Sequence, residues 1–294
     1  MIGITFQGQL GNQMFQYAVA RIASERLRCR LVIGTRGSWH RRLWNAFTNE
    51  INFEIFRVFS LPFSRLSHPL GILKTCSDRT GVVLHRAAFP HSFTDDFEGN
   101  LAYDPRIWDI RGGTWLSGYF QSPRYFVGWE PEIQRWYQPP SDTVSRVNAA
   151  LSTLPENPAD MLSVHVRLGD YVNMIGRYGH PEVGWTLPPA FYERALSRFP
   201  EKVPIALFSD EPDIATTLLP RSPAWVSQGS DHALDLFAMA SFKRMVISNS
   251  SFSWWAAWLN SQPNKEIVAP EFHIGWRDRH WYPADIRVNG WTYV

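Results

Sequence analysis

The segment SVHVRLGDY, near the middle of the chain, brings together side chains that could bind a phosphate. If the segment begins as a strand, alternation places His165 and Arg167 on one face and the apolar residues between them on the other. The glycine that follows allows a turn, which would bring Asp170 beside them. A guanidinium can bind a phosphate through two parallel hydrogen bonds. An ion pair between Arg167 and Asp170 that only pins the turn explains the same residues equally well.

A second candidate is the hydroxyl-rich segment SNSSFSWW, which follows the apolar run Met245–Ser248. A strand that leads into the start of a helix would place Ser250, Ser251 and Phe252 at the helix N-terminus. Free N–H groups and the helix dipole favour an anion there, and hydroxyl groups add donors. The alternative is that a serine only caps the helix. The three hydroxyl groups favour a phosphate site.

A glycine-containing segment, GQLGNQMFQYA, follows the apolar run Ile2–Phe6 near the start of the chain. We expect a strand, a loop containing Gln9, Leu10, Gly11 and Asn12, and a helix from Gln13 onward. A glycine lets backbone approach a ligand closely. The spacing matches neither Gly-x-x-x-x-Gly-Lys-Ser/Thr nor Gly-x-Gly-x-x-Gly, so a P-loop ATPase and an NAD dehydrogenase lose support.

Two further carboxylates occur where chemistry is conceivable. Asp235 lies within an apolar helical pattern, where an unpaired carboxylate is costly, so it needs hydrogen-bond donors. A guanine edge would supply two donors, whereas an arginine or a helix N-terminus would serve a purely structural role. Asp210 follows the apolar run Ile205–Phe208, a position from which a loop carboxylate can reach a cleft, but we expect it to lie in a solvated turn.

Composition excludes several other classes of protein. The 294 residues carry a formal net charge of +2, which argues against a broad nucleic-acid-binding surface. No apolar run approaches the ~20 residues of a membrane span, and we expect a cytoplasmic protein. Two cysteines form neither a disulfide framework nor a zinc site. Asp-x-Asp and His-Glu-x-x-His are both absent, so no metal site is expected.

The elements that would position these residues follow a regular order. Strand and helix patterns alternate through the second half of the chain, which indicates a parallel sheet with crossover helices. A βαβ pattern at the start indicates a second such sheet, whereas the region from Thr35 to Trp115 has a blurred pattern of helices and loops. A Pro-rich junction between about Gln138 and Asp160 predicts two Rossmann-like domains, 1–150 and 151–294. Ligands of such sheets bind beyond the carboxyl ends of the strands.

Four segments in order resemble the α-1,2-fucosyltransferases, glycosyltransferase family 11. They are GQLGNQMFQYA, GYFQSPRYF from Gly118, HVRLGDYV and SNSSFSWWAAWL. One departure is Leu168, where many members carry a second arginine. The resemblance implies a GT-B-like α/β fold of two facing Rossmann-like domains with a donor and acceptor cleft between them. It also implies transfer of fucose from GDP-fucose to the 2-hydroxyl of a terminal galactoside, with inversion and without a metal or other cofactor.

The resemblance also implies roles for individual residues. The second domain would hold GDP and the first would lie on the acceptor side. The implied GDP contacts are His165 and Asp235 for guanine or ribose, and Arg167, Ser250, Ser251 and Phe252 for the phosphates. Residues Gln9, Leu10, Gly11 and Asn12 would close over the donor. Arg167 and Asn12 would act in catalysis, with Asp170 the candidate base.

Other functions remain open at this point. The enzyme could use another donor or form another linkage, for example GDP-mannose or an α-1,6 bond. A non-catalytic glycan-binding module is suggested by the 14 Trp, 19 Phe and 10 Tyr residues, since aromatic rings stack on sugars.

Overall fold

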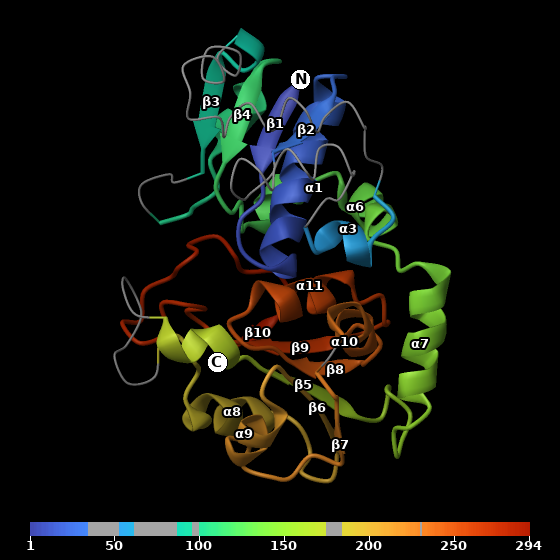
Figure 1. The fold of residues 1–294 in the computed structure, drawn as a ribbon. Helices are drawn as coiled ribbons and strands as arrows, with labels where there is room; N and C mark the ends of the chain where they lie inside the picture. The colour runs from blue at the N-terminus through green and yellow to red at the C-terminus, as the bar shows by residue number, and fades with distance from the viewer. Residues whose placement is uncertain (35–52, 62–86, 96–99, 175–183, 230) are drawn as a thin grey trace. The chain divides into compact units, whose positions relative to one another are not determined.

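The computed structural model describes residues 1–34, 53–61, 87–95, 100–174, 184–229 and 231–294 (Figure 1). The chain divides into two compact units, Met1–Gln138 and Pro139–Val294. The division lies inside the predicted junction but before the expected border at residue 150. That border would cut helix α7 (Ser141–Leu151), which packs against α10 (His232–Met239) of the second unit. Pro139 and Pro140 precede the helix, so the chain changes unit before α7 and not within it.

The first unit contains a four-stranded parallel sheet with the order β2-β1-β4-β3. Its strands are β1 (Ile2–Thr5), β2 (Leu31–Gly34), β3 (His91–Thr94) and β4 (Thr114–Ser117). Its helices are α1 (Leu10–Arg26), α3 (Ile55–Val58) and α6 (Glu130–Trp136), with short 3-10 helices η1 (Pro105–Asp109) and η2 (Pro123–Phe126).

Helix α1 connects the two strands that the sequence predicted at the start of the chain. The sequence spacing predicts that Phe15, Val19, Ile22 and Leu27 share one apolar face, and the first three are fully buried. Leu27 is 37% exposed because it lies at the C-cap beyond the last turn. The helix begins at Leu10 and not at Gln13, so part of the glycine segment is helical.

Strand β3 lies within the region from Thr35 to Trp115, and β4 begins in it. Only helices and loops were expected in that region, so the expectation was wrong for these two strands. Strand β3 is at the sheet edge, and three of its four residues are exposed. An exposed edge strand needs no alternation of apolar and polar residues. Its sequence, HSFT, therefore carries no recognisable strand pattern.

The second unit contains a six-stranded parallel sheet with the order β10-β9-β8-β5-β6-β7. Its strands are β5 (Leu162–Val166), β6 (Ile205–Ser209), β7 (Trp225–Val226), β8 (Arg244–Val246), β9 (Glu266–Ala269) and β10 (Thr292–Tyr293). Its other helices are η3 (Gly169–Asn173), α8 (Pro189–Leu196), α9 (Pro212–Thr217) and α11 (Ser251–Leu259). The predicted alternation of strands and helices and the predicted parallel sheet are confirmed for this half of the chain.

The two faces of β5 differ in the way that alternation predicts. Leu162, Val164 and Val166 join the apolar cluster formed with α8 and α9. His165 faces the opposite side of the sheet, where it contacts Phe252 of α11. In Figure 1 helices α10 and α11 cover one face of this sheet, and α8 and α9 cover the other. Both faces of the sheet are buried, and β5 contributes the polar side chains of Ser163 and His165 to the second face.

The strand order of the second unit decides which loops meet. Strand β5 lies between β6 and β8, and all three run parallel. Their carboxyl ends therefore share one edge, and ligands of such sheets bind at that edge. Asp210 follows β6, Arg167 follows β5, and the serine-rich segment follows β8.

Candidate active site

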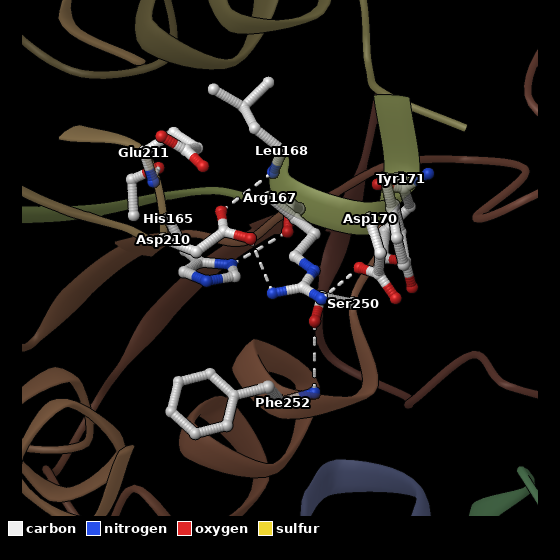
Figure 2. A network of polar contacts seen from close by, with 12 residues as sticks. His165, Arg167, Leu168, Asp170, Tyr171, Asp210, Glu211, Ser250 and Phe252 are labelled. Carbon is white, nitrogen blue, oxygen red and sulfur yellow. Dashed lines mark hydrogen bonds and ion pairs between the residues drawn. The ribbon is translucent and has the colours of Figure 1, made fainter. Parts of the chain in front are cut away.

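Arg167 is the first residue beyond β5 and lies between two carboxylates (Figure 2). Its Nη1 donates a hydrogen bond of 2.6 Å to Oδ2 of Asp210, and its Nη2 pairs with Asp170. The ring of Tyr171 lies 5.2 Å from the guanidinium carbon. The side chain is only 13% exposed, so the cation is held in one place at the carboxyl edge of the sheet.

Asp210 is a site residue that the sequence reading missed, because the expectation of a solvated turn was wrong. Its Oδ1 accepts a hydrogen bond of 2.9 Å from the backbone N–H of Leu168, while its Oδ2 accepts from Arg167. Gly169 makes this approach possible: it has φ +34°, and a Cβ atom there would overlap Oδ2 of Asp210. The usable signal was the position of Asp210, directly after a strand that neighbours β5.

Asp170, the candidate base, forms the ion pair that the structural alternative described. Its side chain is 43% exposed and lies at the start of η3. The structure thus brings Arg167 and Asp170 together as predicted, and adds Asp210. One guanidinium with two carboxylates leaves the cluster with a net negative charge in the absence of ligand.

His165 lies behind this cluster in a buried position. Its Nδ1 is 2.8 Å from Oγ of Ser248, and its ring centre is 5.9 Å from that of Phe252. Burial, and to a smaller extent the positive charge of Arg167, lowers the pKa of His165 to about 3. The imidazole is therefore neutral near pH 7, and it orders the loop after β8 through Ser248.

The serine-rich segment forms the N-terminus of α11. Ser250 is the N-cap, and its Oγ accepts a hydrogen bond of 3.3 Å from the N–H of Phe252, as the capping alternative described (Figure 2). Ser251 is the first helical residue and is half-buried. Asn249 is fully buried; its Nδ2 donates to the Trp185 carbonyl at 2.7 Å, and its Oδ1 has no partner among the described residues. The segment is thus a rigid, polar helix start.

Asp235 is buried on α10, and a serine hydroxyl donates to it, whereas the structural alternative named an arginine or a helix N-terminus. Oγ of Ser227 donates to Oδ1 of Asp235, and burial raises the pKa of the carboxyl group. One turn earlier, the His232 ring lies 5.9 Å from that of Phe252. Helix α10 therefore contacts the start of α11 one turn before Asp235. The predicted contact of Asp235 with guanine stays a prediction.

The glycine segment of the first unit begins helix α1 and does not form an open loop. Gln9 occupies the N-cap position, and Leu10, Gly11 and Asn12 form the first turn. The N–H of Leu10 donates to Oε2 of Glu54 at 3.0 Å, so a carboxylate of the same unit already lies at this helix N-terminus. This position suits an anion because the helix dipole and the N–H groups of the first turn attract one.

Asn12 is held by the GYFQ segment. Its Oδ1 accepts a hydrogen bond of 2.7 Å from Nε2 of Gln121, and a Cβ atom at Gly8 (φ +71°) would overlap its Nδ2. The two motifs, far apart in sequence, are therefore parts of one structure. The contacts of Gln9, Leu10, Gly11 and Asn12 with a donor stay predictions.

The buried carboxylate of Asp95 holds the GYFQ segment in place. Asp95 accepts a hydrogen bond from the N–H of Phe120. It also accepts one of 2.8 Å from the hydroxyl of Tyr125. Burial raises the pKa of Asp95 to about 6 despite these bonds. Phe120 has φ +55°, and Asp95 thus holds an unusual backbone turn directly before Gln121.

The family model described as "Glycosyl transferase family 11" matches residues 111–294 of this chain. This chain belongs to glycosyl transferase family 11. The O-antigen biosynthesis glycosyltransferase WbnK of Escherichia coli is 28% identical to it over 96% of this chain and 98% of the relative. The alpha-1,2-colitosyltransferase of Escherichia coli is 24% identical over 90% of this chain and 89% of the relative.

Among solved structures, a mutant of Arabidopsis thaliana FUT1 in complex with GDP matches this glycosyltransferase with a TM-score of 0.52 and 11% identity. The match covers 91% of this chain and 69% of that chain. The likeness concerns the fold, and it confirms the predicted GT-B-like α/β architecture with two Rossmann-like domains.

Two absences complete the description of this family 11 glycosyltransferase. Within the residues that the structure describes, no group of three or more His, Cys, Asp or Glu side chains is placed to hold a metal ion. Independence from metals stays a prediction. Among the same residues, no helix combines the length and the apolar character that crossing a bilayer requires.

Proposed function

We propose that this glycosyltransferase moves L-fucose from GDP-β-L-fucose to the 2-hydroxyl of a terminal galactoside, with inversion to an α-1,2 linkage and without a metal. The observation that carries the proposal is the placement of Arg167, a held cation at the carboxyl edge of β5. The family, the motifs and the α-1,2 linkage named for one relative support it. The GDP bound in the structurally similar plant protein supports a GDP-linked donor.

The proposed mechanism follows the charge that develops in the reaction. When the bond between C1 of fucose and the β-phosphate oxygen breaks, its electron pair remains on GDP. Arg167 and the positive end of the helix dipole at the start of α11 would stabilise this charge. A metal performs the same work in other transferases. The acceptor oxygen attacks C1 from the opposite face, and Asp170 is the proposed acceptor of its proton.

The second unit would recognise the nucleotide through α10 and α11. Asp235 would accept hydrogen bonds from the adjacent N–H and NH₂ of guanine. Ser227 already fixes one oxygen of that carboxylate, which orients the group. Ser250, Ser251 and Phe252 at the start of α11 would contact the phosphates, and His165 would support ribose or guanine from below.

The first experiment measures transfer directly. The full-length protein is incubated with GDP-fucose and lactose in EDTA, GDP release is followed, and the product linkage is read by NMR. We expect an α-1,2-fucosylated product. The Arg167→Ala variant should lose transfer by a factor of about 100 to 1,000, or about 2.7–4 kcal/mol, as for a removed oxyanion donor. The matched control, Arg198→Ala, removes an exposed arginine of the same unit and should remain active.

Two outcomes would contradict the proposal. Folded protein that transfers fucose to no β-galactoside would refute the acceptor and linkage. Protein that binds glycans but shows no thermal shift with GDP would instead be the non-catalytic binding module.

The relative named for colitosyl transfer suggests GDP-colitose as a second candidate donor. Colitose is fucose without its 3-hydroxyl, so a pocket that ignores this hydroxyl would accept both sugars. Competition between GDP-fucose, GDP-colitose and GDP-mannose, with kcat/KM for each, separates these donors. A GDP-mannose preference would contradict both candidates.

A further inference from the structure

The two carboxylates around Arg167 carry negative charge that opposes the binding of a phosphate at the same cation. Its guanidinium pairs with Asp170 and Asp210 together, while the Tyr171 ring covers one side. A diphosphate brings further negative charge to the same cation. Like charges at a shared cation repel one another, so one carboxylate must leave when the diphosphate binds.

The two carboxylates are held very differently. Asp210 is 24% exposed, binds Nη1 of Arg167 and also accepts from the N–H of Leu168. It lies against Gly169, where a Cβ atom would displace it. These contacts connect Asp210 to two consecutive backbone positions after β5, so it moves only if the turn moves.

Asp170 has weaker support. Its side chain is 43% exposed, and it pairs with the other terminal nitrogen of Arg167 from the short helix η3 (Figure 2). The Asp170 end of this pair is exposed, so water solvates the carboxylate and salt screens its charge. Rotation of this one side chain therefore removes Asp170 from Nη2 of Arg167 at little cost.

We propose that Asp210 is the positioning residue that holds Arg167 throughout the reaction, and that Asp170 occupies the place of the donor phosphate until the donor binds. This inference rests on the proposed function. The phosphate replaces Asp170 at Nη2, and Asp170 is released beside the reacting sugar. Donor binding thus produces the free carboxylate that accepts the proton of the acceptor hydroxyl.

The test compares three variants by calorimetric titration with GDP. The Asp170→Asn variant loses the competing charge, so GDP should bind about 3- to 10-fold more tightly while kcat falls about tenfold or more. The Asp210→Asn variant loses the support of Arg167, so GDP should bind about tenfold or more weakly. Asp213→Asn removes an exposed carboxylate of the same unit and should leave GDP affinity within about twofold.

A second readout separates positioning from folding. The Asp210→Glu variant keeps the charge, so it should recover part of the GDP affinity that Asp210→Asn loses. Thermal unfolding of both variants should be similar. If Asp210→Glu recovers none of the GDP affinity that Asp210→Asn loses, Asp210 acts only on the fold.

The outcomes distinguish this inference from the proposed function. If wild-type protein binds GDP but both Asp170→Asn and Asp210→Asn weaken it, the exchange is refuted and the proposed function stands. If wild-type protein does not bind GDP, the proposed function fails and the exchange fails with it.

Discussion

Replacing Gly169 with alanine tests whether the approach of Asp210 to the turn after β5 matters. Gly169 has φ +34°, and its Cβ atom would overlap Oδ2 of Asp210. The left-handed backbone costs an L-residue about 1–2 kcal/mol. Displacing Asp210 also removes its bond with the Leu168 N–H, and a hydrogen bond to a charged group contributes about 1.5–3 kcal/mol. We therefore expect Gly169→Ala to lower the free energy of unfolding by about 3–5 kcal/mol.

A matched glycine separates the two contributions. Gly290 lies in the same unit and also has positive φ, +86°, but a Cβ atom there meets nothing within 4 Å. Gly290→Ala should therefore cost only the backbone contribution, about 1–2 kcal/mol. Urea denaturation followed by circular dichroism gives both values. GDP titration should show weaker binding for Gly169→Ala alone, because Arg167 loses its partner.

Equal destabilisation by the two substitutions, together with unchanged GDP affinity of Gly169→Ala, would refute this reasoning. It would mean that Asp210 can leave the turn without consequence. Its contacts with Arg167 and Leu168 would then be incidental to the site.

Three further outcomes are expected. Burial raises the pKa of Asp95 from its ordinary value of 3.8 to about 6, so the folded protein retains this proton up to about pH 6 whereas the unfolded chain releases it near pH 3.8. The free energy of unfolding should therefore fall by about 3 kcal/mol as pH rises from 4 to 7, and Asp95→Asn, measured by urea denaturation at each pH, should lose this fall. Gln121→Leu removes the bond to Asn12 and should slow transfer several-fold, about 1 kcal/mol, in initial-rate assays; an unchanged rate would show that Asn12 needs no support. Asp235→Ala should weaken GDP binding about tenfold or more by calorimetry without changing the acceptor KM; equal GDP affinity would exclude the guanine contact.

Local pattern was sufficient for much of the second unit. The alternation in SVHVR predicted which face of β5 carries His165, because period-two alternation is a property of the strand itself. The hydroxyl-rich segment after a strand predicted a helix start at Ser250 and Ser251, within a residue of the observed α11. It failed at β3, an exposed edge strand without an apolar face.

What the sequence determined by itself was the family, the βα alternation and the presence of Arg167 at a strand end. The tertiary structure decided the partners. Asp210 is 43 residues from Arg167, and Gln121 is 109 residues from Asn12, yet each pair forms a hydrogen bond. The physical reason is that strand order brings loops together at one edge of a sheet. Periodicity is a local property of the chain, whereas strand order depends on how distant strands pair.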